Sequence, residues 1–231
     1  MTGTAVLLSG GLDSAVLLAD EASRRGAVVQ PVYVCAGLAW ESAECAMVAR
    51  LLHTAPYASV RPLVSLGVDM RDVYAASHWA VRGAPPAYHT PDEDVYLPGR
   101  NIVLLGKAAV FCAVADLSRI VLGTLAHNPF PDATDEFRAT LARALTLGLA
   151  HEIDIAAPLA GKSKADVIRR GTELGVPFEL TLSCMNPGVG SRDSGFLHCG
   201  VCSKCRERHD AFLELGIADP TVYADQRFVD A

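Results

Sequence analysis

The chain has 231 residues, of which 51% are hydrophobic, and this supplies enough apolar material for a packed α/β domain without disulfide staples. The formal net charge of −6 disfavours non-specific binding to nucleic acid, because a phosphate backbone selects basic surfaces. The apolar run at 5–8 is far too short for a signal peptide or a membrane-spanning helix. We therefore expect a cytoplasmic protein that does not enter a membrane and for which nucleic acid is a disfavoured partner.

The first third of the chain alternates short apolar runs with helical patterns. Valine-rich or otherwise apolar stretches predict three strands, at 4–8, 28–35 and 60–66. Between them, apolar residues at helical spacing predict helices at 14–25 and 41–52. The order strand, helix, strand, helix, strand favours a parallel sheet with helices on both faces.

Residues 75–99 interrupt this alternation with four prolines and three consecutive acidic residues, which indicate a long loop or lid rather than a domain boundary. The alternation then resumes with a helix at 99–117, a strand at 119–124, a loop at 125–133, a helix at 134–147, a strand at 153–157 and a helix at 163–174. We expect a Rossmann-like α/β domain at 1–180. A small C-terminal element at 181–231, with cysteines and one short helix at 204–215, follows it.

A glycine-containing loop separates the first predicted strand from the first predicted helix. Its glycines allow the backbone to approach a ligand closely, and the following helix offers free N–H groups and a positive dipole end. Together these features suit a di- or triphosphate, although a glycine turn that merely caps a helix fits the spacing equally well. An aspartate in such an anion site needs a magnesium ion or a capping role to explain it. The loop consists of Ser9, Gly10, Gly11, Leu12, Asp13 and Ser14.

Four of the seven cysteines crowd into the last fifth of the chain with the spacing C-x14-C-x2-C-x2-C. Two consecutive C-x2-C steps bring three thiolates within reach of one tetrahedral ion, and the first cysteine can complete the shell. Free thiols and an iron–sulfur cluster are the alternatives, and His198 and His209 are rival ligands. The four candidate ligands are Cys184, Cys199, Cys202 and Cys205. The remaining three, Cys35, Cys45 and Cys112, fall in apolar segments and are expected in the core.

The glycine loop resembles the signature of the N-type ATP pyrophosphatases, the PP-loop superfamily. The resemblance implies that the loop holds the β- and γ-phosphates of ATP, which leave as pyrophosphate when a substrate oxygen attacks the α-phosphate. Three further segments, 97–101, 162–166 and 182–184, occur in an order that is similar to the 7-cyano-7-deazaguanine synthase family. That family uses ATP, Mg²⁺ and ammonia to convert a deazapurine carboxylate to an amide and then to a nitrile, releasing AMP and pyrophosphate. It carries structural zinc at the corresponding cysteines and often forms homodimers.

The resemblance also assigns roles to charged residues outside the loop. It implies catalytic roles for Arg100 and Lys164 beside the phosphates, and an ATP-binding role for Asn101. From the residues alone, a surface arginine followed by a capping asparagine is the simpler interpretation at the helix start near residue 100. Lys164 lies in the first turn of a predicted helix, against the dipole, which suggests service to a ligand; a solvated lysine beside Lys162 is the alternative.

Two segments depart from the family pattern, at 35–41 and 127–133, and both lie on the substrate side of the family's pocket. We therefore expect ordinary ATP binding with altered selectivity for the second substrate, in which Trp40, Phe130 and Asp132 provide two aromatic faces and one acceptor. The alternative is that both aromatic side chains only pack the loops. Two other functions remain open: a different PP-loop enzyme, such as an amidotransferase-type ligase or a tRNA thiolase, and a non-catalytic ATP-binding relative.

Overall fold

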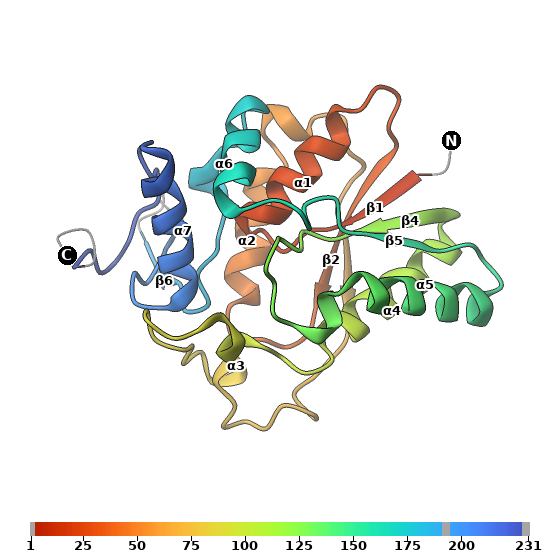
Figure 1. Ribbon diagram of the computed structural model, residues 1–231, viewed down its shortest axis with the longest axis horizontal. Coiled ribbons are helices and arrows are strands. Elements are labelled where there is room, and N and C mark those ends of the chain that lie inside the picture. Colours follow the sequence, from red (N-terminus) through yellow and green to blue (C-terminus); the bar gives the residue numbers. More distant parts are fainter. Residues whose placement is uncertain (1–2, 191–194, 228–231) are drawn as a thin grey trace.

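A computed structural model describes residues 3–190 and 195–227 of the chain. Its centre is a sheet of five parallel strands with the spatial order β3-β2-β1-β4-β5 (Figure 1). The strands are β1 Gly3–Leu7, β2 Val29–Cys35, β3 Val64–Gly67, β4 Leu117–Val121 and β5 Asp154–Ala156. The predicted parallel α/β architecture is therefore confirmed.

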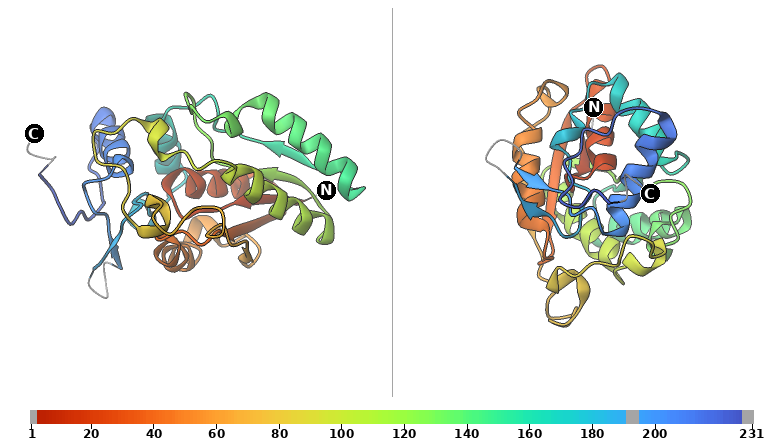
Figure 2. Two further views of the ribbon diagram at one scale, coloured as in Figure 1. Left: turned by 90° about the horizontal axis from the view of Figure 1, so that it is seen from below. Right: turned by 90° about the vertical axis from the view of Figure 1, so that its left-hand side faces the viewer.

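Helices cover both faces of this sheet, as the alternating sequence pattern requires. On β1, Ala5 packs into the cluster beneath α4, whereas its neighbour Val6 packs into the cluster beneath α1. In Figures 1 and 2, α4 and α5 lie on one side of the sheet, and α1, α2 and α6 on the other. The helices are α1 Leu12–Ser23, α2 Glu41–Leu51, α4 Arg100–Val114, α5 Asp135–Leu149, α6 Lys164–Glu173 and α7 Ser203–Leu215.

The strand order reverses direction at β1, and this reversal places the site. From β1 the chain moves outward through β2 to β3, and then returns to the other side of β1 to form β4 and β5. The loops that follow β1 and β4 therefore diverge and leave a crevice at the carboxyl ends of these two strands. Open α/β sheets bind their ligands at such a switch point.

The segment between β3 and α4 is more structured than the expected loop. It contains a short helix α3, Trp79–Arg82, and a 3₁₀ turn η2, Asp92–Val95, neither of which was predicted. The Nδ1 atom of His78 accepts a hydrogen bond from the amide of Ala80, and Gly83 at φ +72° ends the helix one turn later. A four-residue helix has too few positions to show a period in the sequence.

The boundary between α4 and β4 differs from the prediction. The helix was expected to run to Leu117, but it ends at Val114, and Leu117 is the first residue of β4. Asp116 adopts φ +54° between them, and this left-handed conformation turns the chain out of the helix. The apolar character of Leu117 fits a helix and a buried strand equally well, so periodicity alone misplaced it.

The C-terminal region packs directly on the α/β core. It begins with the 3₁₀ turn η4 Phe178–Leu180, continues through the hairpin β6 Gly188–Val189 and β7 Phe196–Leu197, and reaches α7. On α7, Phe212 joins the same apolar cluster as α1 and α6. The amide of Leu182 donates to the carbonyl of Gly10 at 2.8 Å. A division of the chain at 180/181 stays a prediction.

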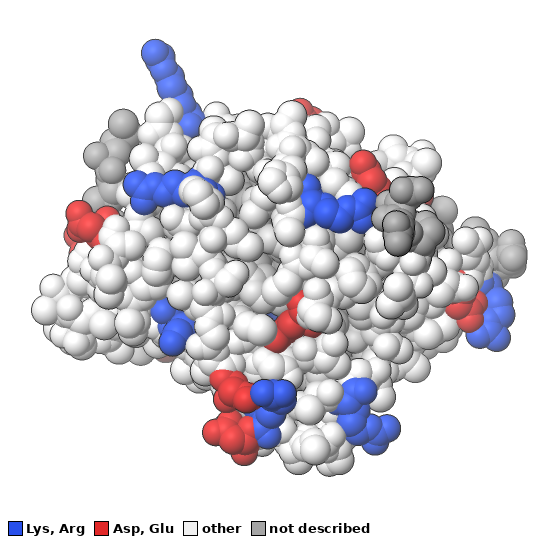
Figure 3. Space-filling model, turned by 180° about the vertical axis from the view of Figure 1, so that it is seen from behind, with Lys and Arg blue, Asp and Glu red and all other residues white. Residues whose placement is uncertain are grey.

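The surface has two features of note. The face in Figure 3 carries its Lys and Arg, and its Asp and Glu, in small separate groups with much neutral surface between them. Helices α4 and α5 expose several apolar side chains, Ile102, Val110, Val114 and Leu147.

Across the described ranges, no helix has both the length and the apolar character needed to cross a bilayer. The homodimer stays a prediction.

Candidate active site

A cavity of about 430 Å³ opens at the switch point of the sheet. It is bounded by the glycine loop after β1, the start of α4, the segment after β4, the start of α6 and the first turns of α7. Most residues singled out in the sequence for ATP chemistry line it together: Ser9, Gly11, Leu12, Asp13, Ser14, Arg100, Asn101 and Lys164. Segments as far apart in the chain as Leu7 and Arg208 therefore contribute to one site.

The glycine loop is held in a single shape by its own serines. The hydroxyl of Ser14 accepts from the amide of Ser9 at 3.2 Å and donates to the carbonyl of Gly11 at 3.0 Å. Gly10 adopts φ +78°, and a Cβ at this position would lie 3.0 Å from Val48 on α2, so glycine is required for both reasons. The loop thus presents the first turn of α1, with its unpaired N–H groups, toward the cavity.

Lys164 lies between two carboxylates at the edge of this loop. Its Nζ atom is 2.5 Å from Oδ2 of Asp13 and 2.9 Å from Oε1 of Glu207, and only 15% of the side chain is exposed. Burial alone would lower the pKa of Lys164, but the two carboxylates outweigh burial and raise it. For Glu207, burial acts to raise the pKa, but the positive charges of Lys164 and Lys204 outweigh burial and hold the pKa at about 2. The ammonium group is therefore charged and positioned inside the cavity rather than in bulk solvent.

Arg100 and Asn101 open α4 at the opposite wall of the cavity. Within the described part of the chain, the buried Nε atom of Arg100 has no hydrogen-bond partner. Asn101 is fully engaged with Asp132: its amide nitrogen donates to Oδ2 and its Nδ2 donates to Oδ1, both at 3.1 Å. Asp132 thus caps α4 and fixes the position from which Arg100 projects. An arginine with an unsatisfied buried donor is suited to an anionic ligand.

Aromatic side chains form the remaining wall. Trp40 is 4% exposed and stacks on Trp79 with the ring centroids 5.8 Å apart and an interplanar angle of 10°. Phe130 is half-buried and faces Tyr96, with the ring centroids 5.2 Å apart. Trp40 and Phe130 line the cavity and also pack the loops that carry them. Their contact with a substrate stays a prediction, as does that of Asp132.

Sequence reasoning missed Glu44 and its partner Tyr33. Glu44 is buried on α2 one helical turn after Trp40, and its Oε2 atom accepts a hydrogen bond from the Tyr33 hydroxyl at 2.8 Å. Burial raises the pKa of Glu44 to about 7, against the opposing effects of Arg100 and Tyr33. Glu44 falls on the apolar stripe of its helix that includes Met47, where a buried carboxylate without a partner is costly. An acidic residue at such a position was the sequence signal that could have identified it.

Three residues of α7 were also missed, because the helix was assigned only to the cysteine element. Lys204, Glu207 and Arg208 all line the cavity. Arg208 is 1% exposed and donates to Thr181 Oγ1 at 2.7 Å and to the carbonyl of Phe178 at 2.8 Å. Their spacing of three and four residues places them on one face of a helix, which is the sequence signal that could have found them.

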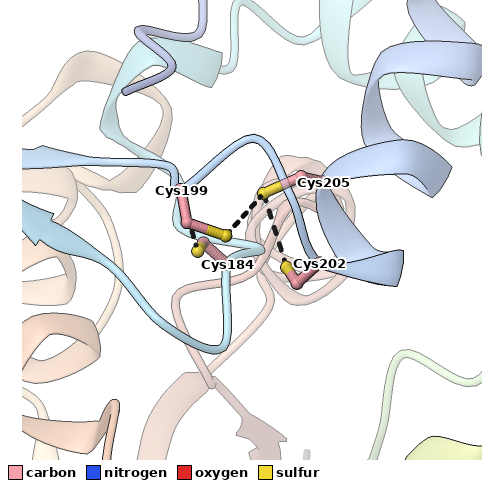
Figure 4. A group of neighbouring side chains, drawn as sticks. All are labelled: Cys184, Cys199, Cys202 and Cys205. Carbon is pink, nitrogen blue, oxygen red and sulfur yellow. Dashed lines mark hydrogen bonds between the residues drawn. The ribbon is translucent and has the colours of Figure 1, made fainter. Parts of the chain in front are cut away.

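The four cysteines predicted as ligands converge at the base of α7 (Figure 4). Their Sγ atoms all lie within 4.8 Å of one another, and the Cys199–Cys205 and Cys202–Cys205 separations are 3.9 and 3.5 Å. A tetrahedral ion with metal–sulfur bonds of ~2.3 Å requires sulfur–sulfur separations of about 3.8 Å. The amide of Cys199 also donates to Sγ of Cys184 at 3.2 Å, which favours a thiolate. The cluster could therefore hold a metal ion.

The rival histidines and the other cysteines lie elsewhere. His198 uses its Nε2 atom to accept from the amide of Ser183 at 3.1 Å, and neither it nor His209 belongs to the group of converging ligand atoms in the described ranges. Cys112 is buried as expected. The expectation for Cys35 is wrong: it is exposed, because it is the last residue of β2, where burial along the strand falls off, and its thiol donates to Oε2 of Glu41 at 3.1 Å.

The chain is an α/β protein whose cavity, at the switch point of its parallel sheet, is suited to an anionic ligand. The chain matches the family described as "Queuosine biosynthesis protein QueC" over residues 4–216, and it belongs to that family. It is 34% identical to a 7-cyano-7-deazaguanine synthase from Methanopyrus kandleri, with 97% of this chain and 100% of that protein covered. It is 35% identical to the synthase from Anaeromyxobacter dehalogenans (95% and 94% covered) and 31% identical to that from Caldicellulosiruptor bescii (94% and 96% covered). The resemblance stated from the sequence is thus confirmed.

Proposed function

We propose that this protein is an ATP-dependent carbon–nitrogen ligase of the 7-cyano-7-deazaguanine synthase type. It adenylates a 7-deazapurine carboxylate, converts the adenylate with ammonia to an amide and converts the amide to a nitrile, releasing AMP and pyrophosphate. The observation that carries the proposal is the convergence of the glycine loop, Arg100 and Lys164 on one cavity in a chain of this family.

In this proposal the loop from Ser9 to Ser14 binds the β- and γ-phosphates of ATP. The free N–H groups of the first turn of α1 donate to the phosphate oxygens, and the helix dipole favours their charge. Arg100 and Lys164 face the loop and stabilise the negative charge that develops as pyrophosphate leaves. Asp13 and Glu207 hold Lys164 in place before ATP binds, and Arg100 brings to the same cavity a buried Nε donor that no described residue satisfies.

Asp13 is the carboxylate that we assign to the Mg²⁺ ion accompanying ATP. Its Oδ1 atom is buried and lacks a hydrogen-bond partner within the described ranges, and carboxylate oxygens are preferred Mg²⁺ ligands. When bound, such an ion would offset part of the phosphate charge. Lys164, which pairs with Asp13 in the free protein, would then be available to the phosphates.

We further propose that the metal at Cys184, Cys199, Cys202 and Cys205 is zinc with a structural role. Four thiolates complete a tetrahedral shell and leave no open position for a substrate. The ion ties the β6–β7 hairpin to the start of α7, and α7 carries Lys204, Glu207 and Arg208 into the cavity. Zinc therefore stabilises one wall of the site without taking part in the chemistry.

Incubation with 7-carboxy-7-deazaguanine and related deazapurine carboxylates, ATP, Mg²⁺ and ammonia tests the function. Mass spectrometry should detect a loss of the carboxyl oxygens in two steps, through the amide to the nitrile, with AMP and pyrophosphate formed in parallel. A protein that binds ATP and converts none of these carboxylates would contradict the proposal. Pyrophosphate release with other acceptors would then indicate a different PP-loop enzyme, and no release at all would indicate a non-catalytic relative.

A further inference from the structure

Glu44 lines the proposed active site but has no role in the ATP chemistry described above. It is 7% exposed and lies on the face of α2 that packs against the phosphate loop, since its carbonyl oxygen is 3.4 Å from the Cβ position of Gly10. A second acidic residue on the same helix, Glu41, is used differently. Its carboxylate accepts from the amides of Ala36 and Gly37 at 2.7 and 2.9 Å and so holds the end of β2.

We infer that Glu44 is the general base of the nitrogen-transfer step, accepting a proton from the ammonium ion that enters the cavity. This inference rests on the proposed function. Ammonium has no lone pair, so it must lose a proton before its nitrogen can attack an acyl adenylate. A buried carboxylate beside the phosphate loop both attracts the cation and removes that proton.

The first half of the reaction forms the amide from the acyl adenylate and ammonium. Glu44 takes one proton from ammonium, and the released lone pair forms the C–N bond at the acyl carbon. The C–O bond to AMP breaks, and AMP leaves with that electron pair. The second proton lost by nitrogen on becoming the amide passes to the AMP phosphate, so the products are the amide, singly charged AMP and protonated Glu44.

The surroundings of Glu44 suit this exchange at neutral pH. The charged and titratable groups that interact with it are Tyr33 from β2, Arg100 from α4, and Glu41 and Cys45 from its own helix. Burial raises its pKa to about 7 although Arg100 and the Tyr33 hydroxyl act in the opposite direction. A general base is most effective when its pKa lies near the working pH. A carboxylate with an ordinary pKa would be a much weaker acceptor.

The test separates adenylation from nitrogen transfer in Glu44→Gln. Carboxylate-dependent exchange of labelled pyrophosphate into ATP should persist, because the phosphate loop is unchanged. Amide formation from ammonia should fall by about 100-fold or more in kcat, which is the usual contribution of a general base. Hydroxylamine, whose conjugate acid is far more acidic than ammonium, enters as the free base. It should therefore give its hydroxamate at a rate within a few-fold of the unaltered enzyme.

Two further variants make the result decisive. Tyr33→Phe removes a hydrogen bond that lowers the pKa of Glu44, so the acidic limb of the kcat profile with ammonia should move to higher pH. Glu21→Gln is the matched control. Glu21 is a buried carboxylate on α1 that pairs with Arg119 outside the cavity, so replacing it should leave the pH profile of kcat unchanged.

Three results would overturn the inference while leaving the proposed function intact. These are an unchanged pH profile in Glu44→Gln, a higher KM for the carboxylate with kcat retained, and loss of hydroxylamine turnover equal to that of ammonia. Failure of the unaltered enzyme to convert any deazapurine carboxylate would instead overturn the proposed function, and this inference with it.

Discussion

At the scale of single residues, the cavity depends on charges that are placed before a ligand arrives. Lys164 is the clearest case, because Asp13 and Glu207 hold its ammonium group beside the phosphate loop. Lys162, two residues earlier, is exposed to solvent. Both lysines lie at the start of α6. Ser163 caps the helix between them, so Lys164 falls in the first turn, where it lines the cavity.

Lys164→Met should therefore reduce pyrophosphate formation by about 100- to 1000-fold, the usual effect of removing one preorganised donor from a developing anion. It also leaves Asp13 without its lysine partner and Glu207 paired with Lys204 alone, so ATP affinity should fall. Lys162→Met is the matched control and should retain full activity. Normal pyrophosphate release by Lys164→Met, measured with a coupled phosphate assay, would show that the lysine has only a structural role.

The phosphate loop itself gives a second expectation at this scale. Ser14→Ala removes the hydroxyl that links Ser9 to Gly11, and Gly11→Val places a Cβ about 3.3 Å from Ser9 Oγ, so the loop must shift. Both variants should abolish pyrophosphate formation with circular dichroism unchanged. Ser23→Ala, at the exposed end of α1, is the control. Normal ATP turnover by both loop variants would exclude the loop as the phosphate site.

Glu44 should make stability depend on pH in a direction opposite to that of a paired carboxylate. Its pKa rises from 4.5 to about 7 on folding, so the folded state resists deprotonation. Below pH 4.5 the group is protonated in both states and contributes nothing. Between pH 4.5 and about 7 the unfolded state ionises while the folded state keeps its proton, so the free energy of unfolding falls by about 3 kcal/mol across this window and levels off above it. Urea unfolding should show Glu44→Gln gaining stability relative to the unaltered protein between pH 5 and pH 8. An equal difference at both pH values would disprove the raised pKa.

At the scale of elements, α7 connects the cysteine cluster to the cavity. Cys202 is the N-cap of α7 and Cys205 lies in its first turn. Glu207 and Arg208, which follow on the same helix, line the cavity. Arg208 in turn fixes the chain after η4 through its hydrogen bonds to Thr181 and Phe178. Loss of the metal should therefore disturb the catalytic wall as well as the local fold.

Purified protein should contain about one zinc ion per chain, measured by elemental analysis. Cys202→Ser should lose this zinc, lower the melting temperature and weaken ATP binding, because a structural metal contributes folding free energy. Cys35→Ser makes the same chemical change at an exposed thiol and should alter none of these properties. Iron with sulfide in the purified protein, or ATP binding unaffected by zinc loss, would contradict this account.

At the scale of the whole molecule, the second substrate meets walls built from distant parts of the chain. The segments at 35–41 and 127–133, which depart from the family pattern, contribute Trp40 and Phe130 to the cavity. Asp132 is already engaged by Asn101 and Trp40 is stacked on Trp79, so the half-buried Phe130 is the more available contact. Sites that leave polar substrate groups unpaired discriminate strongly against them.

We therefore expect a selectivity among deazapurine carboxylates that differs from that of a relative with the usual family residues. The comparison is of kcat/KM across a panel that includes 7-carboxy-7-deazaguanine, with ATP affinity measured in parallel. Trp40→Phe, which keeps an aromatic ring, should change this ranking without changing the Kd for ATP. A clear preference for 7-carboxy-7-deazaguanine would contradict altered selectivity and would make this chain an ordinary member of its family.

Local sequence patterns were enough to predict the features that depend on near neighbours in the chain. Alternating apolar runs predicted the strand and helix order, a glycine loop at a strand–helix junction predicted an anion site, and C-x2-C spacing predicted one cluster of thiols. Each of these rests on a period or a spacing of a few residues, which local geometry translates directly into structure.

Which of these residues meet depends on how distant segments of the chain pack. Glu44 meets Tyr33 of β2, and Lys164 meets Asp13 and Glu207, which lie on two other helices. Cys35 is exposed at the last position of β2, where burial along the strand falls off. The pairing of Lys164 with Asp13 spans 151 residues of chain, and local periodicity carries no record of that distance. The residue types that the site needs can therefore be identified along the chain, but the packing of the strands and helices decides which of them come together.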